Sequence, residues 1–122
     1  MSWEREFSAG YSVPESIVAL VRLGYLQDES WHNDVCPSFG AELKDGTHLK
    51  LWVGHPDLEH SSREEGCRTR FAVLVCPKGW EPGAGDCEEV WEGEEELEAG
   101  RRVILAMNAH GGPRRRLFLA GR

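Results

Sequence analysis

An alternation of apolar and polar residues between positions 39 and 53 places the tightest constraint on how this chain can fold. Apolar residues occupy every second position on both sides of Asp45-Gly46, at Phe39, Ala41, Leu43, Leu49, Leu51 and Val53. A period of two is typical of a strand with one buried face, and Asp-Gly is a turn signal. The sequence therefore predicts a β-hairpin over 39–53, at the centre of a sheet.

The length of the turn decides which side chains share a face. A two-residue loop would pair Leu43 with His48 and separate the apolar residues of the two strands. A three-residue loop over 44–46 pairs Leu43 with Thr47 and keeps them together. Gly46 then lies at a left-handed position, where a Cβ is costly. We predict a positive φ at Gly46 and the pairs Leu43–Thr47, Ala41–Leu49 and Phe39–Leu51.

A helix is predicted over 13–23. Ser12 and Glu15 have the spacing of a capping box, and the apolar positions after them recur with helical periodicity. Gly24 is expected to end the helix as a left-handed cap, with Tyr25 folding back onto Leu20.

A second helix is predicted over 94–109, because acidic residues occupy its first turn and Gly111-Gly112 follows its end. Leu97, Ile104 and Met107 are in phase as its apolar stripe. Gly100 and the run 103–105 leave a strand as the alternative.

Two further strands are predicted, over 69–75 and 87–91. The first is so apolar that both of its faces should be covered. Residues 1–10 are expected to form a loose arm pinned by Trp3 or Phe7, and 113–122 a tail or an edge strand. The prediction is one α+β domain over 1–122, a two-layer sandwich with a mainly antiparallel sheet of four or five strands.

Composition supports a soluble globular chain, with 40% hydrophobic and 29% charged residues among 122. The longest apolar runs, 17–21 and 71–76, are far short of a membrane span. Because the first residues, MSWEREF, do not resemble a secretory signal, a cytoplasmic location is expected. The cysteines at 36, 67, 76 and 87 are then expected to be reduced.

Charge is unevenly distributed along a chain of net charge −7. Residues 81–100 carry nine acidic and no basic side chains, and residues 101–122 carry six arginines and no acid. This balance argues against a general nucleic-acid binder. Arg114–Arg116 could still hold phosphate or RNA, although a role in balancing the acidic stretch within the fold or across a homodimer is the preferred interpretation.

Two polar clusters are candidates for chemistry. His55, Asp57 and His60, with Cys67, could bind zinc or another divalent metal in a metalloprotein or metal-dependent hydrolase. A solvated polar loop is the favoured alternative, and no cofactor is expected. The second cluster holds His32, Asp34 and Cys36, where an imidazole could activate a thiol; a turn with a buried Cys36 is the favoured alternative. Contact between the clusters would strengthen the case for a site.

Trp52 and Trp91 lie among polar residues and need cover from the protein itself or from a partner. Neither a phosphate-binding glycine loop nor a GxSxG or HExxH motif is present in the sequence. We therefore expect a non-catalytic module that binds another protein or itself through these tryptophans.

Overall fold

The structure is a computed structural model, and it describes residues 3–7, 10–31, 34–59, 68–81 and 86–114. Its elements are, in chain order, α1 (Trp3–Glu6), α2 (Glu15–Arg22), β1 (Gln27–Asp28), β2 (Ser38–Glu42), β3 (His48–Val53), β4 (Phe71–Cys76), β5 (Glu88–Gly93) and α4 (Glu96–Ala109). No helix in these ranges has the length and apolar character needed to cross a bilayer.

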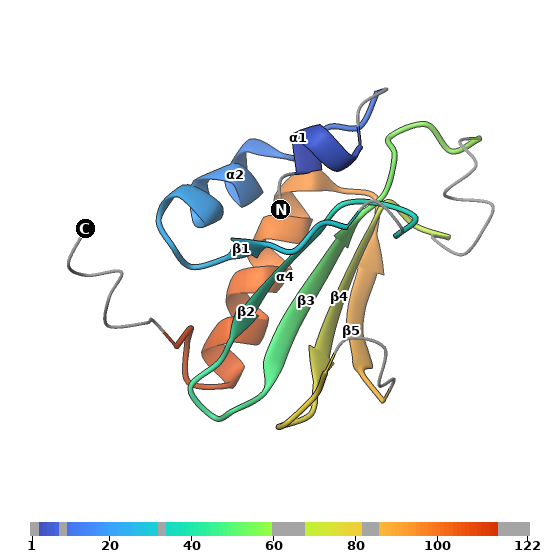
Figure 1. The fold of residues 1–122 in the computed structure, drawn as a ribbon. Helices are drawn as coiled ribbons and strands as arrows, with labels where there is room; N and C mark the ends of the chain where they lie inside the picture. Colours follow the sequence, from blue (N-terminus) through green and yellow to red (C-terminus); the bar gives the residue numbers. More distant parts are fainter. Residues whose placement is uncertain (1–2, 8–9, 32–33, 60–67, 82–85, 115–122) are drawn as a thin grey trace.

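The strands form one antiparallel sheet in the order β1-β2-β3-β4-β5, so β3 is its central strand. Helix α4 runs across one face of this sheet and contacts α2 (Figure 1). The predicted α+β class and antiparallel sheet are confirmed, and helices on one face are compatible with a two-layer arrangement. Within the predicted segment 94–109, Glu96–Ala109 form a helix, so the strand alternative is wrong.

The hairpin has the predicted register. Ala41 lies opposite Leu49, Phe39 lies opposite Leu51, and the Leu43 N–H donates to the Thr47 carbonyl at 2.8 Å. Gly46 has φ = +91°, which confirms the three-residue loop. Hydrophobic alternation and turn chemistry thus agree on one register, as expected where one face of a hairpin is buried.

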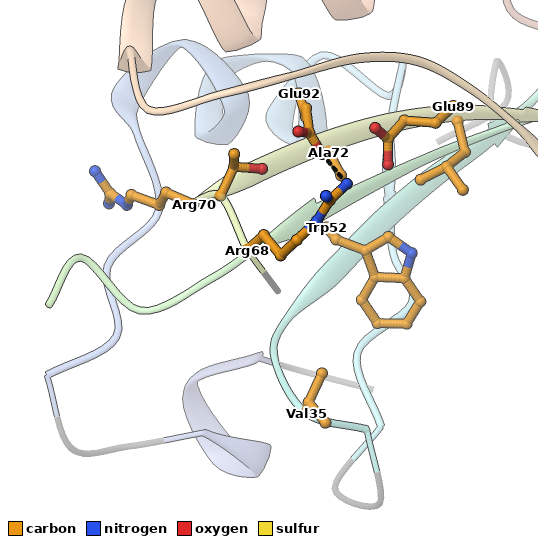
Figure 2. A pocket seen from close by; sticks show the side chains of 9 residues that line it. Val35, Trp52, Arg68, Arg70, Ala72, Glu89 and Glu92 are labelled. Atoms are coloured by element: carbon orange, nitrogen blue, oxygen red, sulfur yellow. Dashed lines mark ion pairs between the residues drawn. The ribbon is translucent and has the colours of Figure 1, made fainter. Parts of the chain in front are cut away.

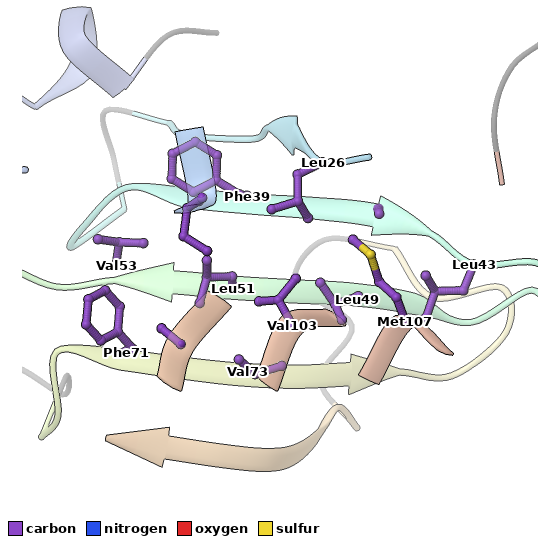
Figure 3. Packing of buried hydrophobic residues seen from close by; sticks show 13 residues of the cluster. Leu26, Phe39, Leu43, Leu49, Leu51, Val53, Phe71, Val73, Val103 and Met107 are labelled. Carbon is purple, nitrogen blue, oxygen red and sulfur yellow. The ribbon is translucent and has the colours of Figure 1, made fainter. Parts of the chain in front are cut away.

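The core lies between the sheet and α4 (Figure 3). Leu49, Leu51 and Val53 point inward from β3 and are fully buried. Helix α4 buries Ala99, Gly100, Val103 and Met107. The stripe predicted for this helix is therefore correct only at Met107, since Leu97 is 84% exposed and Ile104 is 46% exposed. Gly100 allows a close approach, because a Cβ there would lie 2.7 Å from the Ser16 Oγ on α2.

Helix α2 ends as predicted but begins differently. Gly24 has φ = +81°, and the Tyr25 N–H donates to the Leu20 carbonyl at 2.9 Å, as in a Schellman cap. At the other end Pro14 is the N-cap and makes no side-chain capping bond, so the predicted capping box is wrong. The Ser12 hydroxyl instead accepts a 3.0 Å hydrogen bond from the guanidinium of Arg70.

Parts of both terminal segments dock onto the sheet. In the predicted arm, residues 3–6 form α1, the Trp3 N–H donates to Asp28 at 2.8 Å, and Phe7 is buried. In the C-terminal segment, Pro113 bridges to Leu43 and the Arg114 N–H donates to the Glu42 carbonyl at 2.7 Å. Residues 115–122 lie outside the described ranges.

One expectation about the cysteines is wrong. Cys76 and Cys87 form a disulfide, with their Cα atoms 4.1 Å apart. Cys76 ends β4 and Cys87 directly precedes β5, so the antiparallel pairing of these strands brings the two residues together.

Candidate functional site

The two faces of the sheet differ in what covers them. The face toward α4 carries the core, whereas β3 presents His48, Lys50 and Trp52 on the other face, each only partly buried. We call this second side the open face. Two of the cavities formed by the described residues lie along it, and none of the residues that line these two belongs to a helix.

The first cavity lies beside Trp52 (Figure 2). In the register of the sheet, Trp52 is opposite Ala72, and Ala72 is opposite Glu92. Because Ala72 has a small side chain, this row is hollow between the indole and the carboxylate. The cavity has a volume of about 330 Å³ and is lined by Val35, Trp52, Arg68, Thr69, Arg70, Ala72, Leu74, Glu89 and Glu92.

Two carboxylates on β5 border this cavity. Burial, followed by the hydrogen bond and charge repulsion from Glu92, raises the pKa of Glu89. Arg68 is 3.6 Å from the Glu92 carboxylate but is itself 81% exposed. The Arg70 side chain points away from Trp52 (Figure 2), and its guanidinium pairs with Glu96 at 2.5 Å. The cavity therefore combines an indole wall with two carboxylates, one of which pairs with the exposed Arg68.

The second cavity lies at the β1 side of the open face. It has a volume of about 550 Å³ and is lined by Glu29, Trp31, Asp34, His48, Lys50 and Trp80. Trp31 is 44% exposed, and the Trp80 ring stacks on the His48 ring with centroids 5.4 Å apart. Aromatic rings and carboxylates thus occur together here as well.

Glu29 lines the second cavity and is fixed there by two side-chain contacts. Its carboxylate accepts a 2.9 Å hydrogen bond from Lys50 Nζ and lies 3.2 Å from His48 Nε2. Burial alone would raise the pKa of Glu29, but the hydrogen bonds from His48 and Lys50 outweigh it and hold the pKa below its ordinary value. Gly40 leaves room for this arrangement, since a Cβ there would lie 2.6 Å from Glu29 Cδ.

Lys50 connects the two cavities. Its ammonium pairs with Glu29 on one side and lies 5.2 Å from the centroid of the Trp52 ring on the other. In the register of the sheet, Lys50 is opposite Leu74, and Leu74 is opposite Glu89. The open face is thus one continuous surface of alternating aromatic, acidic and basic groups.

Trp52 and Trp91 lie on different sides of the sheet. Trp91 is opposite the buried Val73, packs against the core cluster and has the Arg102 guanidinium 6.0 Å from its ring centroid. The Trp91 ring is therefore covered by side chains of the protein itself. Trp52 lies on the outward face, as the hairpin alternation predicted.

The predicted metal ligands fall partly outside the described ranges, where His60 and Cys67 lie. His55 is nearly buried; its Nδ1 accepts from the Asp57 N–H at 3.0 Å, and its ring packs edge-on against Tyr11. Among the residues that the structure describes, no three His, Cys, Asp or Glu side chains are grouped as metal ligands.

The second predicted cluster is also only partly described. His32 lies outside the described ranges, Cys36 is a buried free thiol, and Asp34 lines the second cavity. Of the arginine run, only Arg114 is described, and its guanidinium pairs with Glu42 at 3.0 Å.

Several residues of the open face were missed in the sequence. Glu29, Trp31, Trp80, Glu89 and Glu92 come from three separated segments, and only the sheet register brings them together. No signal for the open face was present in the sequence of β4, because Phe71–Cys76 are all apolar, and only the structure shows Ala72 and Leu74 alternating with the buried Phe71 and Val73. The expectation that both faces of this strand are covered is wrong, because Ala72 and Leu74 line a cavity.

Neither a family model, nor a curated protein, nor a solved structure shows significant similarity to this chain.

Proposed function

We propose that this chain is a non-catalytic module that binds another protein through the open face of its sheet. The observation that carries the proposal is the position of Trp52, outward on the central strand and at the wall of a 330 Å³ cavity. Tryptophan is enriched among the residues that dominate binding energies at protein interfaces, where it fills a pocket and is surrounded by weaker contacts.

The surroundings of Trp52 fit such a role. Val35, Ala72 and Leu74 supply apolar contact area around the indole, while Arg68, Glu89 and Glu92 form a polar border. An apolar centre with a polar rim is the usual composition of a protein interface. Trp91 is not part of the proposed interface, because its ring packs against the core of the chain and beside Arg102 of α4.

Site-specific photo-crosslinking tests whether the open face meets a partner. A photoreactive benzoylphenylalanine replaces Val35, which is 39% exposed at the first cavity, and in a control chain it replaces Leu97 on α4. We expect one discrete protein adduct, with a second copy or with another protein, from position 35 only. Equal labelling from both positions, or none from position 35, would contradict the proposal.

The captured protein then allows a quantitative test. Trp52→Ala should weaken its binding about thirtyfold or more, the equivalent of a hot-spot residue worth 2 kcal/mol. Trp91→Ala is the matched control and should bind as the parent chain does. Unchanged binding by Trp52→Ala refutes the proposal, and a Trp52→Ala chain that fails to fold assigns Trp52 to the core instead.

A further inference from the structure

We infer that the partner presents an extended basic segment whose lysine or arginine side chains enter the two cavities of the open face. This inference rests on the proposed function and names the chemistry of the partner. It depends on the pairing of indole rings with carboxylates in both cavities.

The first cavity is suited to a cation. Arg68 pairs with Glu92 at 3.6 Å but is 81% exposed, so a positive group from a partner would compete with it for the space beside Trp52, Glu89 and Glu92. Cations are attracted to the face of an indole, and charge-assisted hydrogen bonds to carboxylates are the stronger kind. The two carboxylates already repel each other, so a bound cation would also relieve that repulsion.

The second cavity repeats the combination. Trp31 and Trp80 supply two indoles, and Asp34 and Glu29 supply two carboxylates. Aromatic rings attract cations to their faces, and carboxylates add charge-assisted hydrogen bonds, although Glu29 already pairs with Lys50.

Lys50 shows that the open face accommodates a cation of this kind. Its ammonium makes both contacts expected of the partner, an ion pair with Glu29 at 2.9 Å and a position 5.2 Å from the Trp52 ring centroid. A lysine or arginine from a partner would extend the same pattern into the cavities on either side.

An extended segment fits this geometry better than an isolated charge. Successive side chains on one face of a strand belong to every second residue, and Lys50 and Trp52, two residues apart on β3, each line one of the two cavities. The net charge of −7 favours a basic partner in addition.

A peptide titration followed by NMR tests the inference directly. The probe is acetyl-Gly-Arg-Gly-Arg-Gly-amide, and its control carries citrulline, which keeps the shape of arginine without the charge. The readout is the set of indole N–H resonances from the chain's five tryptophans. We expect the arginine peptide to shift Trp31, Trp52 and Trp80 but not Trp3 or Trp91.

The citrulline peptide should bind about three- to fivefold more weakly for each cation lost. Equal binding of the two peptides, no shift at millimolar peptide, or equal shifts of Trp3 and Trp91 would each overturn the inference.

Matched variants give a second readout. Glu92→Gln should weaken binding of the arginine peptide about threefold, whereas Glu15→Gln, on the exposed first turn of α2, removes the same charge and should not. Lys50→Met removes a competing cation and should tighten binding of the peptide about threefold. Equal effects of Glu92→Gln and Glu15→Gln, or weaker binding by Lys50→Met, contradict the inference.

Different experimental outcomes would refute the basic-segment inference and the proposed function. If position 35 crosslinks a partner whose binding depends on Trp52 but is unaffected by Glu92→Gln and by the ionic strength, the open face binds protein and the basic segment is wrong. If position 35 captures nothing, the proposed function itself fails.

Discussion

Gly40→Ala should drive the Glu29 carboxylate off the open face and destabilise the fold. A Cβ at position 40 would lie 2.6 Å from Glu29 Cδ and 2.7 Å from His48 Nε2. Because both contacts are with the far ends of side chains, these side chains will move while the β2–β3 pairing persists. The cost is therefore the loss of the bonds that Glu29 makes with His48 and Lys50.

The magnitude follows from two opposing effects. A hydrogen bond to a charged group contributes about 1.5–3 kcal/mol; we take about 2 kcal/mol for the whole arrangement, because Glu29 is partly exposed and regains water when displaced. Alanine is better than glycine within a strand by about 0.5–1 kcal/mol. The free energy of unfolding of Gly40→Ala should thus fall by about 1–1.5 kcal/mol.

The pH dependence provides an internal check. The pKa of Glu29 is lower in the folded chain than its ordinary value of 4.5. The stabilisation it supplies is therefore fully present above pH 4.5 and is lost as the pH falls through the folded pKa. Urea unfolding followed by tryptophan fluorescence should show the full difference between Gly40→Ala and the parent at neutral pH, and a smaller one in acid.

A double-mutant cycle can refute this reasoning. In a Glu29→Ala background, Gly40→Ala removes no further ion pair and should be neutral or slightly stabilising. If it costs as much in that background as in the parent, Gly40 is required for a reason other than room for Glu29. A difference that persists unchanged below the folded pKa of Glu29 would contradict the argument as well.

Three other predictions concern the β2–β3 turn, the Cys76–Cys87 disulfide and the Arg70–Glu96 ion pair. Thr47→Val should raise the pKa of Asp45 from about 2 toward 3.8, because the Thr47 hydroxyl makes the hydrogen bond that lowers it most; a carboxyl NMR titration measures this shift, and an unchanged midpoint contradicts it. Reducing the disulfide of the β4–β5 hairpin should lower the free energy of unfolding by about 3 kcal/mol, since it closes a loop of about a dozen residues; urea unfolding with and without a thiol reductant tests this, and coincident curves would refute it. Glu96→Gln should lower the free energy of unfolding by about 2 kcal/mol, because it leaves the buried guanidinium of Arg70 without its ion pair while water reaches the half-exposed position 96. Arg70→Met removes the buried charge itself, so thermal unfolding should show a smaller destabilisation for that variant than for Glu96→Gln.

The parts of the fold that could be predicted depend on local chemistry. Alternating residues and Gly46 define the hairpin register, and Gly24 defines the end of α2. These features are decided by neighbours in the chain, where side-chain periodicity and left-handed backbone act directly.

The parts that could not be predicted depend on contacts between distant segments. Arg70 takes Ser12 as a partner across 58 residues and so removes it from the capping box. Glu29 reaches Lys50 only because β1 and β3 flank the same glycine of β2. Trp52 could be assigned to a face from its own strand, but the cavity beside it requires the register of β4 and β5.

The sequential strand order has a consequence for how the chain emerges from the ribosome. Each strand pairs with its neighbour in the sequence, so the hairpins can form as soon as their residues leave the exit tunnel. Helix α4 comes last, and it carries Ala99, Val103 and Met107, which close the inner face. Until α4 has been synthesised, the apolar side of the sheet therefore has no helix α4 to cover it. A chain cut short before residue 109 keeps part of that side exposed, where chaperones and proteases can act on it.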